Sequence, residues 1–487
     1  MVFHSPTFLF LFLPLCLALH FIVPKRFRNV VLLFASLLFY SWGEPKAVAV
    51  MLVSIASNYA YGRWLDSARE REASDRKLRT IVGVAVVTNL GLLIAFKYAN
   101  WLWDQAQTVL ASLGFEETSR LELGHIPLPV GISFFTFQAL SYIVDLYRKQ
   151  GEVQRKPLDF ALYIALFPQL IAGPIVRYRD VALQIRERTV VRRDFAEGVR
   201  RFLIGLGKKV LIADLCALPA DYIFDTVPQD QLSMSVAWLG VVCFAIQLYF
   251  DFSGYSDMAI GLSRMFGFRL LENFQWPYIS RSITEYWRRW HISLSSWFRD
   301  YLYIPLGGSR RGPVSTYFNL FTVFLLCGLW HGAAWNFVAF GMCHGIILVI
   351  ERAGLSKLME CWPRPLQHVY FLFTILTSYV VFRAPTLSNS YHYLSAMFGF
   401  GDSSGLQTLG LYLDRELSLA LGLGILGSMP WLAAVWKWRN TARERGTSRV
   451  AYSTYDIAET LALLGLLVLV AIQISASRYS PFIYFRF

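Results

Sequence analysis

Long apolar runs recur along almost the whole chain, and they limit the folds that it can adopt. A transmembrane helix needs about 20 largely apolar residues, and these runs are continuous, whereas the strands of a membrane β-barrel alternate. Of the 487 residues, 55% are hydrophobic and 16% are charged. The sequence therefore predicts an all-α polytopic membrane protein with roughly 11–12 transmembrane helices. The expected spans are 6–24, 29–42, 46–62, 80–96, 127–147, 202–224, 234–260, 314–334, 335–353, 366–383, 417–436 and 457–475.

The basic residues cluster in the loops between these spans and orient the chain. Loops 63–79, 177–201 and 437–449 are rich in arginine, so they are expected on the cytoplasmic side. No Lys or Arg precedes the first apolar run, and a basic cluster follows it at 25–28. The run is therefore expected to be a retained span with its N-terminus outside. No long linker or repeat divides the sequence, so a single integral membrane domain over 1–487 is expected.

One further apolar segment, 158–176, has basic loops on both sides and so cannot cross the membrane completely. It contains Phe167-Pro168-Gln169 and Ala172-Gly173-Pro174, which break a helix. Such breaks at membrane depth are tolerated only beside other protein or a cavity. The segment is therefore expected to be a re-entrant hairpin.

Three other kinds of chemistry are not expected. The net charge of +13 could suit nucleic acid, but the arginines lie in loops between spans, where positive charge follows membrane topology. The six cysteines form no CxxC pattern, so they are expected to be buried apolar residues rather than disulfides. His291, His331 and His344 lack the spacing of a zinc site, so no metal is expected.

Two histidines inside the apolar chain give the strongest functional signal. His291 lies in Tyr286-Trp287-Arg288-Arg289-Trp290-His291, and His331 lies in Leu329-Trp330-His331-Gly332. A charged side chain at the centre of a membrane helix costs roughly 2.5–3.5 kcal/mol, so ionisable residues there usually have a function. Histidine can also accept and return a proton near neutral pH. The alternative is that each is a hydrogen-bonded packing residue.

The block around His291 is expected to be a helix that lies at, or dips below, the cytoplasmic surface. Ser282-Ile283-Thr284-Glu285 is a capping box that opens it, and Pro305 and Gly307-Gly308 are expected to end it. On one continuous helix Trp287 and His291, four residues apart, would share a face. The arginines could bind a phosphorylated ligand or lipid headgroups; they are Arg288, Arg289, Arg299, Arg310 and Arg311.

Several longer stretches together resemble the membrane-bound O-acyltransferase family, in particular a bacterial branch that serves alginate O-acetylation. The resemblance runs from Met1-Val2-Phe3 to the closing residues 480–485, and 385–456 is its least characteristic part. The matching stretches are 129–138 (PVGISFFTFQ), 170–174 (LIAGP), 247–261 (QLYFDFSGYSDMAIG), 285–295 (EYWRRWHISLS) and 329–332 (LWHG).

The resemblance implies a function as well as a fold. It implies a helical bundle around a central tunnel in a bacterial inner membrane, with His331 as the catalytic histidine and His291 as a second polar residue. Trp287, Arg288, Arg289 and Trp330 are then expected to contact substrate. Acetyl-CoA would bind from the cytosol as a substrate, without any cofactor. The acetyl group would pass to a periplasmic partner protein for O-acetylation of an exopolysaccharide such as alginate or cellulose.

Three other functions fit parts of this pattern. Transfer of another acyl group, such as D-alanine from a carrier protein to teichoic acid, would also suit a basic cytoplasmic face. A transporter or export channel would show inverted repeats and paired broken helices, whereas the sequence has one broken segment and no internal symmetry. A non-catalytic scaffold would leave the two buried histidines without a role.

Overall fold

Helices form the whole of the described architecture. The computed structural model describes residues 1–114, 124, 126–228, 231–400, 408–431, 434–435, 441, 449–476 and 482, and these residues contain no strand. The helices of the first half are α1 (Leu13–Ile22), α2 (Arg28–Ser41), α3 (Ala47–Glu70), α4 (Asp75–Lys97), α5 (Ala99–Ser112), α6 (Ile132–Tyr147), α7 (Pro157–Ala165), α8 (Phe167–Leu170), α9 (Tyr178–Arg186), α10 (Arg192–Lys208) and α11 (Asp214–Asp225). Those of the second half are α12 (Met234–Met265), α13 (Ile283–Arg289), α14 (Ile292–Phe298), α15 (Pro313–His331), α16 (Trp335–Ile350), α17 (Ser356–Glu360), α18 (Arg364–Arg383), α19 (Leu387–Met397), α20 (Arg415–Gly427) and α22 (Arg449–Ala476).

The predicted all-α polytopic membrane fold is confirmed. Six of the helices within the described residues are long and apolar enough to cross a bilayer: α4, α12, α15, the continuous helix Trp335–Glu360, α18 and Thr454–Ala476. Several other predicted spans are shorter helices, such as the 14-residue α2 and the 16-residue α6. The end of the predicted 417–436 span and most of the basic loop 437–449 lie outside the described residues.

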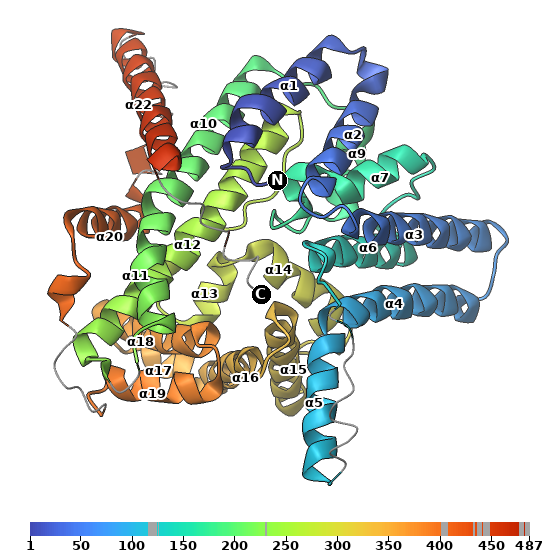
Figure 1. The fold of residues 1–487 in the computed structure, drawn as a ribbon. Coiled ribbons are helices and arrows are strands. Elements are labelled where there is room, and N and C mark those ends of the chain that lie inside the picture. The colour runs from blue at the N-terminus through green and yellow to red at the C-terminus, as the bar shows by residue number, and fades with distance from the viewer. Residues whose placement is uncertain are drawn as a thin grey trace.

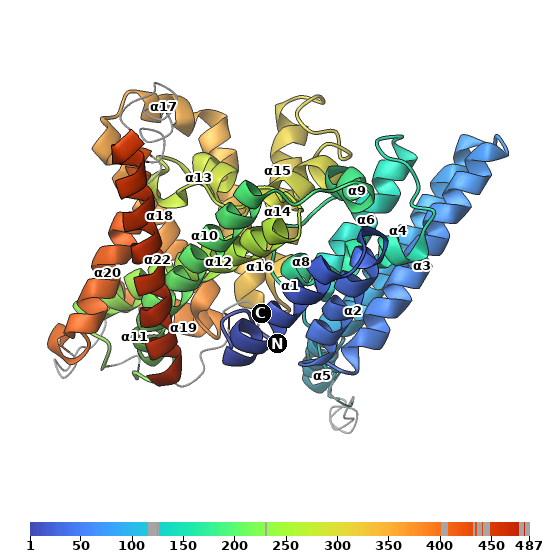
Figure 2. The same ribbon diagram turned by 90° about the horizontal axis from the view of Figure 1, so that it is seen from above.

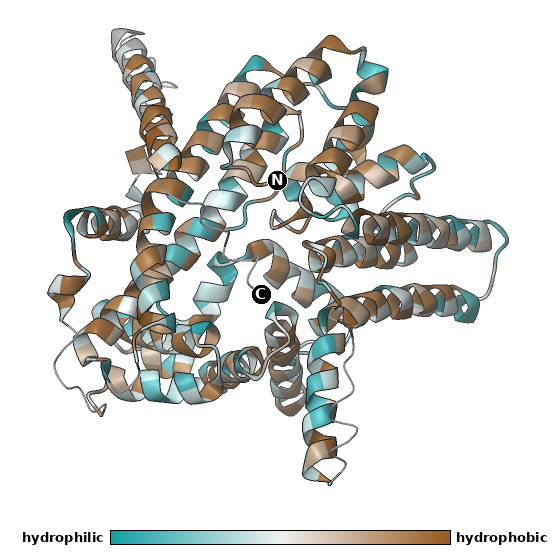
Figure 3. Cartoon of the chain, in the orientation of Figure 1, coloured by the Kyte–Doolittle hydropathy of each residue, from teal (hydrophilic) through white to brown (hydrophobic). Residues whose placement is uncertain are grey.

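The helices surround a centre that contains α13 and α14 (Figure 1). Seen from above, α17 and the turn between α3 and α4 lie at one edge of the molecule, α9 lies farther in on the same side, and α5 lies at the opposite edge (Figure 2). The first edge carries the arginine-rich loops, so it is the cytoplasmic side by the positive-inside rule. Peripheral helices such as α3 and α4 are mainly hydrophobic along their length (Figure 3), as expected of surfaces that face lipid.

The 32-residue α12 is the most buried of the six helices long and apolar enough to cross a bilayer, and it packs closely against α10. A Cβ atom on Gly205 would lie 2.6 Å from the carbonyl oxygen of Gly254, and one on Gly261 would lie 2.6 Å from that of Gly198. Glycine at these positions lets the two backbones touch, as is common between membrane helices.

The same contact neutralises the two carboxylates that interrupt the apolar run of α12. Asp257 accepts hydrogen bonds from Arg201 at 2.9 Å and from Lys208 at 2.7 Å. Asp251 pairs with the buried Lys209 at 2.8 Å. These carboxylates therefore join helices.

The predicted re-entrant segment is confirmed as a broken pair of short helices. The backbone leaves helical geometry at Leu166, between α7 and α8. The two ends of the segment meet, because the Gln154 side chain donates a hydrogen bond of 3.1 Å to the Tyr178 hydroxyl. The chain thus dips and returns to the side from which it came.

Helix α13 begins as predicted but does not continue through His291. The Ser282 hydroxyl accepts a hydrogen bond of 3.0 Å from the Glu285 backbone N–H, which forms the predicted cap. The helix ends at Arg289, and His291 adopts a left-handed conformation with φ 43° before α14 starts. The prediction of one continuous helix as far as Pro305 was therefore wrong, and Trp287 and His291 do not share a helix face.

Candidate active site

His331 is the last residue of α15 and lies in the interior of the bundle. Its side chain is 6% exposed. Its ring packs at 5.2 Å from the ring of Phe382 on α18 and at 5.9 Å from that of Phe340 on α16. The chain leaves the helix at Gly332, where an added Cβ would lie 2.2 Å from the Phe337 ring. The imidazole therefore sits in an apolar, aromatic environment.

A cavity of about 130 Å³ reaches His331. Its wall includes Lys97 at the end of α4 and Gly131 and Ile132 at the start of α6. The other ends of α4 and α6, near Asp75 and Arg148, belong to the arginine-rich side. The cavity therefore approaches His331 from the side opposite the basic loops, which is the outer side of the membrane.

A wider outer cavity of about 480 Å³ borders the first one. Val130 and Ile171 line both. The wider cavity also contains Tyr40, Trp42 and Glu44 from the outer end of α2 and the residues that follow it. The two neighbouring cavities are together called the outer vestibule, which is defined by the residues that line either of them, and the smaller cavity is the one beside His331.

His291 is fully buried and is held by Asn273. The His291 Nδ1 atom lies 3.2 Å from Asn273 Oδ1. The same oxygen accepts hydrogen bonds from the backbone N–H of Ser293 at 3.1 Å and from its hydroxyl at 2.9 Å. Because a backbone N–H can only donate, this Asn273 atom must be the amide oxygen, and Nδ1 of His291 must carry the hydrogen.

The other nitrogen of His291 then presents a lone pair. Burial, and next the neighbouring His331, lower the pKa of His291 well below its usual value. The ring is therefore neutral at physiological pH, with Nε2 as an acceptor. Nε2 is buried and has no hydrogen-bond partner among the described residues.

Trp330 stands between the two histidines. Its ring centroid lies 6.0 Å from that of His291 and 5.0 Å from that of His331. Phe137 packs against Trp330 at 5.9 Å and stacks face to face on Trp297 at 3.9 Å. The aromatic residues thus continue from the histidines towards α14.

This aromatic column, made of Trp330, Phe137, Trp297 and Tyr301, ends in a cluster of charges. Tyr301 packs at 5.2 Å from Trp297, and the guanidinium groups of Arg148 and Arg177 lie over its ring at 5.4 and 5.3 Å. Both arginines belong to the loops that the sequence assigns to the cytoplasm. The column therefore joins the histidines to the cytoplasmic side of the protein.

The other predicted site residues lie farther from this centre. The Trp287 indole donates a hydrogen bond of 3.1 Å to Nδ1 of His344 and packs against Phe324. Arg289 pairs with Glu285 at 2.9 Å, and Arg288 is exposed to solvent. Trp287 and Arg289 thus have partners within the protein, and a role in substrate contact stays a prediction for all three.

Two residues near the histidines were missed from the sequence. Lys97 directly follows the predicted span 80–96, at a position where lysine usually extends to the membrane surface, so nothing in the sequence marked it as a functional residue. Asn273 lies in an irregular segment with no recognisable motif. Among the residues that the structure describes, no group of three His, Cys, Asp or Glu side chains is arranged to hold a metal ion.

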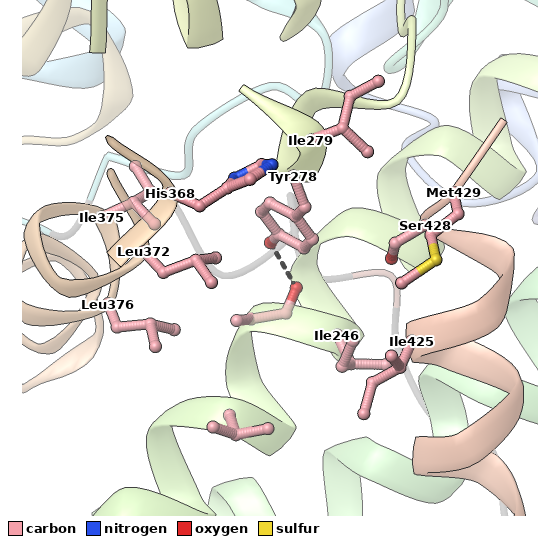
Figure 4. A pocket seen from close by; sticks show the side chains of 12 residues that line it. Ile246, Tyr278, Ile279, His368, Leu372, Ile375, Leu376, Ile425, Ser428 and Met429 are labelled. Atoms are coloured by element: carbon pink, nitrogen blue, oxygen red, sulfur yellow. Dashed lines mark hydrogen bonds between the residues drawn. The ribbon is translucent and has the colours of Figure 1, made fainter. Parts of the chain in front are cut away.

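A separate cavity of about 450 Å³ lies between α12, α18 and α20. Figure 4 shows its lining, in which Tyr278 donates a hydrogen bond of 2.6 Å to the Ala245 carbonyl group. Apolar side chains such as Ile375 and Ile425 form most of the wall, and neither His291 nor His331 lines it. His368 also lines this cavity, which is separate from the centre that contains His291 and His331.

Comparison with known proteins identifies the family of this centre. The family model for the membrane-bound O-acyltransferases matches residues 135–395. This stretch carries His291, Trp330 and His331. The chain belongs to the membrane-bound O-acyltransferase family. It is therefore a multi-pass membrane protein and an acyltransferase.

Relatives of this acyltransferase extend over its full length. It is 42% identical to a probable alginate O-acetylase of Azotobacter vinelandii, with 100% of both chains covered. It is 36% identical to a peptidoglycan O-acetyltransferase of Helicobacter pylori over 83% of this chain and 81% of the relative. A teichoic acid D-alanyltransferase of Streptococcus thermophilus is 30% identical, over 47% of this chain and 58% of the relative. The family resemblance inferred from the sequence is confirmed.

Proposed function

We propose that this membrane-bound acyltransferase moves an acetyl group from cytosolic acetyl-CoA to a hydroxyl group that enters the outer vestibule. The acceptor belongs to a periplasmic partner protein, which passes the acetyl group to an exopolysaccharide such as alginate or cellulose. The enzyme acts in a bacterial inner membrane. The observation that carries this proposal is the position of His331, a buried histidine that lines a cavity together with the ends of α4 and α6 that lie opposite the arginine-rich loops.

His331 acts as the general base. It takes the proton of the acceptor hydroxyl while the oxygen attacks the carbonyl carbon of the thioester. The carbon–sulfur bond breaks, and the proton passes from the imidazolium group to the departing thiolate, which leaves as CoA. Base assistance of this kind contributes about 10²–10⁴-fold to a rate, and holding the two reactants together contributes most of the remainder.

His291 holds the donor. Its neutral ring has Nδ1–H bound to Asn273, so Nε2 can accept a hydrogen bond but cannot donate one. An acceptor nitrogen suits an amide N–H of the pantetheine arm of acetyl-CoA. It does not suit polarisation of the thioester carbonyl, which needs a donor. Of the two roles that the sequence allowed for His291, this geometry favours binding.

The donor reaches the histidines along the aromatic column. Arg148 and Arg177 stand at its cytoplasmic end and could attract the phosphates of CoA. Arg177 already forms an ion pair with Asp300 at 2.7 Å. We therefore expect the cytoplasmic end of the column to be rigid and its positive charge to be partly neutralised. The tunnel that would join this end to the vestibule stays part of the proposal.

Acetyl is favoured over D-alanyl as the transferred group. The relatives named as O-acetylases match the full chain at about 40% identity, whereas those named as D-alanyltransferases match less than half of it. Acetyl is also the smaller group, which suits a cavity of about 130 Å³.

The proposal predicts that His331→Ala abolishes acetyl transfer. Purified protein is incubated with radiolabelled acetyl-CoA, and release of CoA and transfer of label are measured beside His392→Ala, an exposed histidine on α19. A loss of about 10²–10⁴-fold is expected for His331→Ala, with wild-type rates for His392→Ala. Full activity of His331→Ala at a normal protein level would overturn the assignment of the base.

A further inference from the structure

The carbonyl groups at the end of α15 need hydrogen-bond donors from outside the helix. The last carbonyl groups of a helix have no partner within the helix, and inside a membrane protein water cannot easily supply one. The residue after His331, Gly332, is extended at φ −168°, so no left-handed cap closes the helix. The helix that carries the histidine therefore needs donors from elsewhere.

A dipeptide at the end of α4 supplies these donors. The Tyr98 hydroxyl donates to the Leu329 carbonyl at 2.6 Å. The ammonium group of Lys97 donates to the Trp330 carbonyl and, at 3.2 Å, to the His331 carbonyl. Three consecutive carbonyl groups at the end of α15 are thus satisfied by two adjacent side chains.

Lys97 also stands beside the reacting group. It lines the same cavity of about 130 Å³ as His331, and its Nζ atom lies 5.8 Å from the centre of the Trp330 ring. Its amino group is placed at the C-terminal end of α15, where hydrogen-bond donors and cations are favoured. Lysine is seldom half-buried inside a membrane protein, so packing alone does not explain a lysine at position 97.

We propose that Lys97 is a positioning residue, which with Tyr98 fixes the backbone of His331 and so aims its imidazole into the outer vestibule. This inference rests on the proposed role of His331 as the base. Lys97 holds the backbone carbonyl groups of His331 and Trp330. The aromatic rings of α16 and α18 pack against the imidazole of His331. The catalytic geometry therefore depends on a helix, α4, that contributes no group to the proton transfer itself.

The test compares four variants with the wild type in the radiolabelled acetyl-CoA assay. Lys97→Met keeps the length of the side chain and removes all donors, whereas Lys97→Arg keeps the donors and the charge. Tyr98→Phe removes one hydrogen bond. Lys46→Met is the matched control, because Lys46 is an exposed lysine just before α3, also on the outer side.

A misaligned base lowers kcat and leaves donor binding intact. Lys97→Met is expected to lose about 100-fold in kcat, the order of a displacement of about 1 Å at a reacting group, with an unchanged KM for acetyl-CoA. Lys97→Arg is expected to recover most of this loss, Tyr98→Phe to lose less than Lys97→Met, and Lys46→Met to lose nothing. Thermal unfolding in detergent shows whether each variant is folded.

The outcomes separate this proposal from the function on which it rests. A folded Lys97→Met with wild-type kcat, beside an inactive His331→Ala, overturns the role of Lys97 alone. Equal changes in kcat and KM, or no rescue by Lys97→Arg, would also contradict a positioning role. Activity of His331→Ala instead overturns the proposed base, whatever Lys97→Met does.

Discussion

The backbone of His291 is the most constrained feature at the residue scale. Non-glycine residues seldom adopt positive φ, and those that do are often found at functional sites. Here φ is 43°, and the conformation is held on both sides of the residue. The Ile292 N–H donates to the Asn273 carbonyl at 3.0 Å, and the Gln275 N–H donates to the Arg289 carbonyl at 2.9 Å. The segment 273–275 therefore shapes the break in the helix.

The buried, neutral state of His291 predicts a pH dependence of stability. Burial and His331 lower its pKa in the folded protein below the value of about 6.5 in an unfolded chain. As the pH falls below about 6.5, the unfolded state binds a proton that the folded state does not bind, so stability decreases. His291 alone contributes a loss of up to about 1.4 kcal/mol for each pH unit.

The His291→Asn variant should show a smaller loss, because asparagine does not titrate and accepts a left-handed conformation. The apparent melting temperature of the purified protein is measured between pH 7.5 and pH 5.5. The wild type is expected to lose more than His291→Asn over this range, and the exposed-site control His392→Asn is expected to follow the wild type. Parallel curves for all three proteins would show that His291 is not buried in the neutral form.

Sequence reasoning found the two histidines but not the residues that hold them. A histidine inside an apolar run can be recognised in the sequence because transmembrane segments rarely contain ionisable side chains. Asn273 lies 18 residues before His291 in an irregular segment, and Lys97 lies more than 230 residues before His331 in the sequence. Only the folded chain brings them together, so no local pattern could reveal them.

At the scale of elements, α13 is positioned by a buried carboxylate from another helix. Glu351, which follows α16, accepts hydrogen bonds from the backbone N–H groups of Ile283 and Thr284, both at 2.8 Å. The Thr284 hydroxyl and the Tyr370 hydroxyl also donate to it. Because the first N–H groups of a helix lack internal partners, Glu351 acts as an N-terminal cap supplied by a distant part of the chain.

Replacement of this carboxylate should loosen α13. Glu351→Gln leaves one acceptor oxygen for four donors, so a loss of about 1–3 kcal/mol in stability is expected. Hydrogen–deuterium exchange at residues 283–289 should become faster, while exchange in α12 stays slow. Glu360→Gln, an exposed carboxylate at the end of α17, should change neither. Unchanged exchange in 283–289 would show that the Ser282 cap holds the helix without Glu351.

The boundaries of α13 illustrate what a sequence can reveal about an element. Its start was predicted correctly, because the Ser282–Glu285 cap is formed by four residues that are neighbours in the sequence. Its end was not, because Trp290 and His291 have no intrinsic tendency to stop a helix. The stop is imposed by hydrogen bonds to 273–275, which compete with helix continuation.

At the scale of the whole molecule, Trp330 lies where the outer vestibule and the aromatic column meet. The aromatic column and its arginines lie on the cytoplasmic side, and the vestibule with Glu44 and Lys97 lies on the outer side. The sequence assigns this orientation through the arginine-rich loops, whose charge follows a general rule of membrane insertion, and the orientation stays a prediction. It could not predict the vestibule, whose wall joins α2, α4, α6 and α15.

Such an arrangement predicts that acetyl transfer has a direction. In proteoliposomes of known protein orientation, radiolabelled acetyl-CoA is supplied on one side and a short serine-containing peptide on the other. The peptide should be labelled only when acetyl-CoA faces the side of the arginine-rich loops, because CoA is too large and too charged for the cavity of about 130 Å³ beside His331. His331→Ala vesicles should give no label in either arrangement. Labelling when donor and peptide share one side, and not when they are separated, would mean that both substrates use the same entrance and that no acetyl group crosses the membrane.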